Sequence, residues 1–319
     1  MPIQISGGVQ LSGPVTLTQS SGGSGGGFQG SNYGYTSGGF INNVTNVIDK
    51  FPFASDTNAS DVGDLTEALR FTSGNSSSTD GYTVGGQGTS NIQKFSFSSD
   101  GNASNVGTQS FQRYGTAGQS SSTDGYTTGG FNPGALNIID KFPFASNGTA
   151  TDVGDLVVSR AYFCGVSSST FGYSVGGNIW PATPNSNTTL DKFPFASDSN
   201  ATDVGDLSSN GPQFKSGQNN STHGFASGGW NDTNTRISNI EQFSFSTDGN
   251  ATDVGNLNNN VAQGVGTSST SSGYHAGGNY PGSPAITSQI DKFSFNDSST
   301  ATDVGDLTTA RYAGSGQQY

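Results

Sequence analysis

Few residues of this chain have the chemistry for catalysis or metal binding. Among its 319 residues there are one cysteine, Cys164, and two histidines, His223 and His275. A single cysteine allows no internal disulfide and no cysteine-based metal site. The histidines stand at different places relative to the repeated aromatic residues, two before Phe225 and one after Tyr274. We therefore expect both to be surface residues of strands or turns, and Cys164 to be a buried, inert thiol within a strand.

A glycine-rich stretch, GYTVGG at residues 81–86, could by itself be a phosphate-binding loop. Related stretches occur six times, and the first glycine of each closing pair stands at positions 38, 85, 129, 176, 228 and 277. The gaps of 47, 44, 47, 52 and 49 residues predict a β-propeller or another repeat array. We therefore interpret the glycine pair as a structural element of each repeat, where positive φ and close packing are needed.

Each repeat contains four short β-like runs, which we call strands A to D. In the second repeat they are expected at residues 68–76, 81–84, 91–97 and 103–106. No window has a 3.6-residue apolar period, so helices are not expected. Residues 306–319 contain a strand A with no strand B after it, whereas residue 34 opens a strand B with no strand A before it. The sequence predicts one all-β domain, a six-bladed propeller over residues 34–319, closed when the C-terminal strand joins the first blade.

Residues 1–33 stand outside the repeat and include a Gly/Ser run at residues 20–27. We expect them to form a short N-terminal arm and linker that anchors the propeller; a frayed terminus is the alternative. The start of the chain lacks the features of a conventional secretory signal, and no apolar run approaches the ~18 residues of a membrane helix. Membrane insertion is therefore not expected.

The net charge of −12 bears on possible partners. There are 11 Lys and Arg against 23 Asp and Glu. Five of the lysines are spread one per blade, at positions 50, 94, 141, 192 and 292. No basic patch can form from such a distribution, so nucleic acid is not an expected partner.

The turns between strands C and D are rich in Asp and Asn, for example Asp56, Asn58 and Asp61. Oxygens at such spacing could ligate Ca²⁺. The turns lack the acidic count and the closing Glu of a strong site, and the same residues stabilise turns through side-chain hydrogen bonds. We favour the turn interpretation and expect no metal or other cofactor, with these three residues as the calcium alternative.

The loops between strands B and C vary most around the ring, from residues 87–91 to residues 178–189. They carry large aromatic residues: Phe40, Phe131, Trp180, Trp230 and Tyr280. Aromatic residues on variable loops suit a binding face for a sugar or a protein partner. The alternative is that each caps the hydrophobic end of its own blade.

The glycine pair after an aromatic strand, the later strand of Ile-x-x-Phe type and the L-x-x-A-R start of the next repeat resemble the kelch motif. The resemblance covers residues 34–319, and its arginines are matched to Arg70, Arg113, Arg160 and Arg311. The chain differs from the kelch motif in strand D, where kelch repeats usually carry a Trp and this chain has valines. Some kelch-type propellers are copper radical oxidases, whose site needs two His, a Tyr and a Tyr linked to Cys. The scattered His223, His275 and Cys164 do not match that set, so no enzyme is expected.

The sequences of the repeats, with their DVGDL and SSSTDGY segments, also resemble those of kelch-like virion proteins of tailed bacteriophages. This resemblance implies a non-enzymatic structural protein on the outer surface of a phage tail or capsid. It would contact other virion proteins through residues 1–33 and adhere to a glycan or protein of the host surface. The alternative is a cellular kelch-type scaffold for protein–protein interactions.

Overall fold

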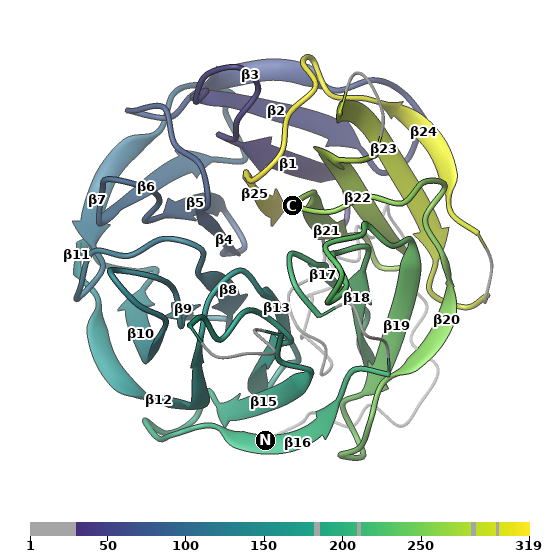
Figure 1. The fold of residues 1–319 in the computed structure, drawn as a ribbon. Coiled ribbons are helices and arrows are strands. Elements are labelled where there is room, and N and C mark those ends of the chain that lie inside the picture. Colours follow the sequence, from purple (N-terminus) through teal and green to yellow (C-terminus); the bar gives the residue numbers. More distant parts are fainter. Residues whose placement is uncertain (1–29, 182–185, 209–211, 282–284, 298–299) are drawn as a thin grey trace, which may run out of the picture.

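The computed structural model describes residues 30–181, 186–208, 212–281, 285–297 and 300–319. In this part of the chain six antiparallel sheets stand around a central axis as blades, with no helix (Figure 1). The predicted all-β, six-bladed propeller is confirmed. No helix long and apolar enough to cross a membrane occurs among these residues.

The strands of each blade follow one another from the axis outward. Blade 1 contains β25 (Ser315–Gln318), β1 (Tyr33–Ser37), β2 (Val47–Pro52) and β3 (Ser60–Asp64). Blade 2 contains β4 (Ser73–Ser76), β5 (Asp80–Val84), β6 (Asn91–Ser96), β7 (Ser104–Thr108) and, parallel to β7, the short β11 (Gly148–Thr149). Blade 3 contains β8 (Ala117–Ser120), β9 (Asp124–Thr128), β10 (Leu136–Pro143) and β12 (Thr151–Arg160).

Blades 4 to 6 have the same order. Blade 4 contains β13 (Cys164–Ser167), β14 (Phe171–Val175), β15 (Thr189–Pro194) and β16 (Thr202–Asp206). Blade 5 contains β17 (Ser216–Asn219), β18 (His223–Ser227), β19 (Asn239–Ser244) and β20 (Thr252–Asn256). Blade 6 contains β21 (Val265–Ser268), β22 (Ser272–Asn279), β23 (Ile286–Ser294) and β24 (Thr302–Asp306).

The expected strand A of the second repeat was too long at its start. Strand β4 begins at Ser73, and residues 68–72 belong to the connection from strand D of the preceding blade. Phe71 has a φ of 56°, a left-handed conformation that cannot continue a β-strand. The D–A connection is therefore a structured loop.

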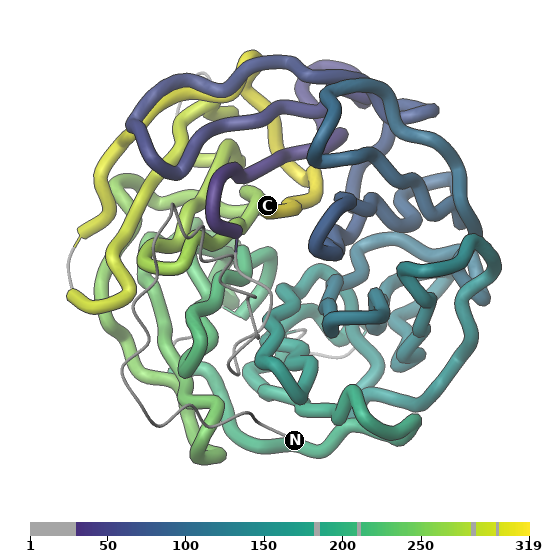
Figure 2. The backbone as a smooth tube through the Cα atoms, turned by 180° about the vertical axis from the view of Figure 1, so that it is seen from behind, coloured from purple at the N-terminus to yellow at the C-terminus, as the bar shows by residue number. Residues whose placement is uncertain are grey.

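The ring closes between the two ends of the repeat region, as predicted. Strand β25 pairs antiparallel with β1, from Gly34 opposite Gln318 to Ser37 opposite Ser315. The rear view shows the C-terminal segment beside the start of the ring, close to the axis (Figure 2). Pairing β25 with β1 covers the strand edge that blade 1 would otherwise expose.

Six glycines bring the innermost strands together around the axis: Gly74, Gly118, Gly165, Gly217, Gly266 and Gly316. A Cβ built on any of them would lie 2.0–2.3 Å from the carbonyl oxygen of the corresponding glycine in the neighbouring blade. Larger side chains cannot fit at this spacing, so the innermost strands require glycine at this position.

Aromatic rings fill the space between blades. The aromatic residue of each strand B stacks on the second Phe of strand C in the next blade, as Tyr82 does on Phe144 with ring centroids 4.9 Å apart. The equivalent pairs recur at all six junctions, including Tyr274 with Phe53 where the ring closes. Rings at such distances bury a large apolar area and add a specific packing geometry. The aromatic residue of strand B therefore fills the space between neighbouring blades.

The expected anchor, residues 1–33, lies outside the described residues except for its last four. Gly30 donates its N–H to the carbonyl of Ser268 in blade 6, and Tyr33 already belongs to β1.

Candidate functional site

The B–C loops and the D–A connections meet on one face of the ring. In five blades the residue directly after the glycine pair forms a bridge with the D–A connection, as Phe40 does with Tyr312 and Trp230 with Gln213. In blade 2, Gln87 donates its N–H to the carbonyl of Arg70 in that connection. The two sets of loops therefore form one continuous surface, which we call the loop face.

A closed ring of backbone hydrogen bonds lies at the centre of the loop face. Its members are one residue from each D–A connection, all with positive φ: Phe71, Gly115, Tyr162, Phe214, Gln263 and Ala313. Each donates its N–H to the carbonyl of the previous member, at 2.7–3.0 Å, and the N–H of Phe71 reaches the carbonyl of Ala313. The six loops hold one another in place, which makes the centre of this face rigid.

Three members of this ring are bulky aromatic residues in a conformation that suits glycine. Phe71, Tyr162 and Phe214 have φ values of 56–57°, whereas Gly115 occupies the same position in blade 3. Such conformations cost on the order of 1–3 kcal/mol and persist where the surroundings enforce them, often at functional sites. All three residues line a hollow of about 70 Å³ between the D–A connections.

Aromatic residues of both loop sets form a chain of ring contacts, which we call the aromatic arc. Its members are Phe40, Phe71, Tyr114, Phe131, Tyr162, Trp180, Phe214, Trp230 and Tyr312, with ring centroids 4.8–6.3 Å apart where they contact. The Arg70 guanidinium joins its two parts, lying 4.6 Å from the ring centre of Phe40 and 5.3 Å from that of Phe71. The arc spans blades 1 to 5.

Four of the five aromatic residues selected from the sequence belong to the arc. Phe40, Phe131 and Trp230 are half-buried, whereas Trp180 is 53% exposed. Tyr280 lies apart from them and packs against the apolar cluster between blades 5 and 6. The structure thus gathers Phe40, Phe131, Trp180 and Trp230 on one surface. It places Tyr280 at a cavity that Val261 and Asp291 also line.

Sequence reasoning missed the D–A members of the arc, because residues 68–76 were assigned to a strand. A signal was present: an aromatic residue follows the arginine in Arg70-Phe71, Arg113-Tyr114 and Arg311-Tyr312. The match of Arg70 to the other three arginines was wrong by one position. Leu69 stands where Arg113, Arg160 and Arg311 stand, two residues before the positive-φ residue.

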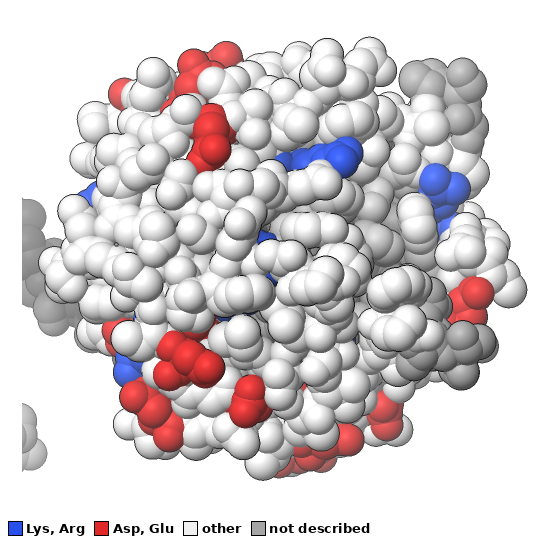
Figure 3. Space-filling model, turned by 60° about the vertical axis from the view of Figure 1, so that its left-hand side comes forward, with Lys and Arg blue, Asp and Glu red and all other residues white. Residues whose placement is uncertain are grey.

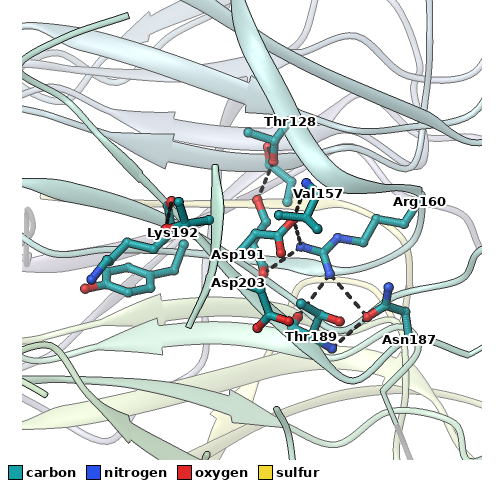
Figure 4. A network of polar contacts seen from close by, with 12 residues as sticks. Thr128, Val157, Arg160, Asn187, Thr189, Asp191, Lys192 and Asp203 are labelled. Carbon is teal, nitrogen blue, oxygen red and sulfur yellow. Dashed lines mark hydrogen bonds and ion pairs between the residues drawn. The ribbon is translucent and has the colours of Figure 1, made fainter. Parts of the chain in front are cut away.

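Buried ion pairs hold the loop face from beneath. Arg160, at the end of β12 in blade 3, points to Asp191 on β15 of blade 4, with 2.9 Å between Nη2 and Oδ2 (Figure 4). Arg160 also donates to the carbonyls of Thr189 and Ser174, each at 3.0 Å. Burial lowers the pKa of the Arg160 guanidinium and raises that of the Asp191 carboxyl, while each charge opposes the shift of its partner. Equivalent buried pairs are Arg113–Asp140, Lys215–Glu241 and Arg311–Asp49.

The two histidines do not behave alike. His223 is partly exposed, but His275 is only 2% exposed, so the expectation of a surface position is wrong for His275. Its imidazole is turned inward on β22, with Nδ1 3.0 Å from the Ser227 hydroxyl, and it fits because Gly264 has no side chain. Burial, and secondarily the charge of Lys215, lower its pKa to about 3. Cys164 is buried on β13, as expected, and burial raises its thiol pKa to about 12.

The acidic turns connect neighbouring blades at the outer edge. Asp56 accepts a hydrogen bond from Lys292 at 2.9 Å, Asn58 from the N–H of Asp306 at 3.1 Å, and Asp61 from the N–H of Gly63 at 3.1 Å. The three side chains thus have three different partners. Within the described ranges, no three His, Cys, Asp or Glu residues gather as metal ligands. Figure 3 shows acidic side chains at the edges of the ring and a surface formed mostly by uncharged residues.

Comparison with known proteins supports the fold and does not extend to a family. A solved structure titled "Structure of YjhT" is similar with a TM-score of 0.65 and 13% identity, over 79% of this chain and 88% of that one. No protein-family model matches the sequence, and the search of curated proteins found no match. Because 248 chains of solved structures match, the fold is widely shared and does not by itself identify a function.

Proposed function

We propose that this chain is a non-enzymatic display protein of a tailed-phage particle, whose aromatic arc binds a glycan or protein on the host surface. The observation that carries the adhesive part is the set of strained aromatic residues Phe71, Tyr162 and Phe214 around the axis of the loop face. Large aromatic side chains at three of the positive-φ positions of this surface favour a binding role over simple capping of each blade.

The composition of the arc also suits recognition. Trp, Tyr and Arg are the residues that contribute most to binding energy in interfaces, and rigid rings lose little entropy when a ligand docks. The arc includes Trp180 and Trp230, with Arg70 stacked on Phe40. The closed hydrogen-bond ring at the centre of the face fixes the backbone of Phe71, Tyr162 and Phe214 before a ligand arrives, which lowers the cost of association.

The virion context rests on the resemblance of the repeats to phage virion proteins, and mounting through residues 1–33 is part of the same proposal. Mass spectrometry of purified particles tests it. We expect the protein in the particles, and its loss from them when residues 1–33 are deleted. Absence from particles, together with recovery in a soluble complex of cellular proteins, would instead favour a kelch-type scaffold.

The adhesive role has its own test. The purified chain is applied to host-cell envelopes and to arrays of surface glycans, alongside a variant carrying Trp180→Ala and Trp230→Ala. We expect binding by the natural chain and loss of binding by the variant. Equal retention of both proteins would contradict a role for the aromatic arc.

A further inference from the structure

The six blades provide an internal comparison at one buried position of strand C. The residues there are Asp49, Gln93, Asp140, Asp191, Glu241 and Asp291. Each accepts a hydrogen bond from a backbone N–H in the segment that leads from strand D of the preceding blade to the next strand A, at 2.6–3.0 Å. The six side chains are therefore structurally equivalent, and differences between them reflect what each blade places opposite.

A cation faces this position in four blades. Arg113, Arg160 and Arg311 stand two residues before the positive-φ residue and pair with the acid of blades 3, 4 and 1. Blade 5 has Pro212 there, and Lys215 supplies the charge to Glu241 instead. Blade 2 is neutral on both sides, with Leu69 and Gln93.

Blade 6 departs from this rule. Its acid is Asp291, but Val261 stands at the arginine position. All eleven Lys and Arg of the chain lie in the described residues, and none of their ion pairs there includes Asp291. Asp291 is 4% exposed, and its hydrogen-bond donors, the Asn258 N–H at 3.0 Å and the Gln289 amide at 2.6 Å, are both neutral. A buried carboxylate without a counter-charge is costly.

A cavity of about 190 Å³ accompanies the absent arginine. Val261, His275, Gly277, Gln289 and Asp291 line it, with the exposed Asn259 at its edge. This volume far exceeds the ~10–15 Å³ that a single water needs. We call it the blade-6 cavity.

The backbone that holds the arginine in other blades has counterparts around this cavity. In blade 3, Arg113 donates Nε to the Gly129 carbonyl at 2.7 Å and Nη2 to the Thr127 carbonyl at 3.0 Å. Gly277 and His275 occupy the same two positions of strand B in blade 6 and line the cavity.

His275 does not supply the missing charge. Its pKa of about 3 keeps the imidazole neutral near neutral pH, and its Nδ1 is engaged with Ser227. Its Nε2 is buried without a hydrogen-bond partner among the described residues. The cavity is therefore lined by a buried carboxylate without a counter-charge and by a histidine whose Nε2 has no hydrogen-bond partner among the described residues.

We propose that the blade-6 cavity binds a guanidinium group from a ligand, which takes the place of the arginine side chain found in blades 1, 3 and 4. A planar guanidinium donates in a fixed fork that matches a carboxylate together with neighbouring carbonyls. The net charge of −12 raises the local concentration of cations around the ring. The group can belong to a free guanidinium compound or to an arginine side chain of a peptide.

Isothermal titration of the full chain with methylguanidinium, and with its uncharged counterpart methylurea, tests the proposal. We expect methylguanidinium to bind and methylurea to bind roughly tenfold more weakly or not at all, because only the former carries the charge. A capped Gly-Arg-Gly peptide forms a second arm. Stronger binding of the peptide assigns the site to a partner's arginine, and binding of methylguanidinium alone assigns it to a small molecule.

Two variants check the location. Asp291→Asn removes the charge and is expected to abolish binding. Val261→Arg with His275→Thr rebuilds the blade 1 set of Arg311, Thr36 and Asp49, and is expected to exclude the ligand while melting no lower than the natural chain. Thermal melts check that both variants are folded. Absence of heat with methylguanidinium and the peptide, equal affinity for methylurea, or unchanged binding by folded Asp291→Asn would overturn the proposal.

Discussion

Arg113 and Asp140 form an ion pair from which water is excluded: Nη1 lies 2.9 Å from Oδ2, and neither side chain has any exposed surface. Blade 2 places Leu69 and Gln93 at the same two positions and builds the same blade. The chain therefore contains both a charged and a neutral solution to one packing problem.

This pair of solutions makes a double-mutant cycle decisive. Arg113→Leu leaves the Asp140 carboxylate buried and unpaired and should lower the free energy of unfolding by about 3–5 kcal/mol. Arg113→Leu with Asp140→Gln copies blade 2 and should recover most of that loss, since Gln93 accepts the same inter-blade hydrogen bond at 2.6 Å. Urea unfolding of the single and double variants measures both. Additive losses would contradict the interpretation.

The six glycines around the axis are needed for close packing, although their φ values are ordinary for a strand. Replacing one of them should therefore destabilise the protein for steric reasons. A Cβ on Gly74 would lie 2.0 Å from the Gly316 carbonyl oxygen, so Gly74→Ala must push β4 away from β25. We expect a loss near the upper end of the about 1–3 kcal/mol typical of overpacking. Gly134→Ala is the matched control, because nothing lies within 4 Å of its added Cβ. Equal melting temperatures for the two variants would contradict this role.

Because β25 closes the ring, we expect deletion of the last five residues to destabilise the protein severely. Deleting residues 315–319 removes β25 and exposes the edge of β1. We expect aggregation and loss of a cooperative thermal transition, measured by light scattering during a melt. Tyr319→Ala serves as the control, because it removes the ring contact with Phe97 at 5.3 Å and leaves the backbone pairing. If the truncated chain melts like the natural one, closure by β25 is not important for stability.

The fold could be predicted from the sequence because its determinants recur. The glycine pair and the Phe-x-Phe strand occupy fixed offsets, and the unmatched strands at the two ends specify how the ring closes. The loop face could not be predicted equally well. The positive φ of Phe71 and Tyr162 is imposed by hydrogen bonds to neighbouring blades, which no local pattern of side chains reveals.

The buried arginine position was also misassigned from the sequence, because the arginine of the second repeat is offset by one residue. Arg70 looks equivalent to Arg113 by its neighbours in the sequence, yet it stacks on Phe40 at the surface while Leu69 fills the buried position. The sequence alone also does not show that Val261 replaces the arginine in blade 6. This replacement becomes visible once Arg113 and Asp140, far apart in their repeat, are known to contact each other.

Trp180 provides a test of the loop face that leaves the fold intact. Because its side chain is 53% exposed, Trp180→Ala should change the free energy of unfolding by less than about 0.5 kcal/mol. It should weaken binding to the host-surface ligand. Phe111→Ala is the control, since Phe111 is 45% exposed and is not a member of the arc. Equal binding by both variants would remove Trp180 from the site.

His275 predicts a dependence of stability on pH with a definite sign. In the unfolded chain a histidine binds a proton near pH 6.5, whereas burial and the nearby Lys215 lower the pKa of His275 to about 3. Between these values the unfolded state binds more protons, so the free energy of unfolding falls as the pH falls from about 6.5 towards 3. His275→Thr, which installs the residue found at position 36 in blade 1, should make this fall shallower. Urea unfolding at pH 7 and pH 4 measures it, with His223→Thr as the partly exposed control. The same slope in the natural chain and in His275→Thr would show that the imidazole is protonated within the fold.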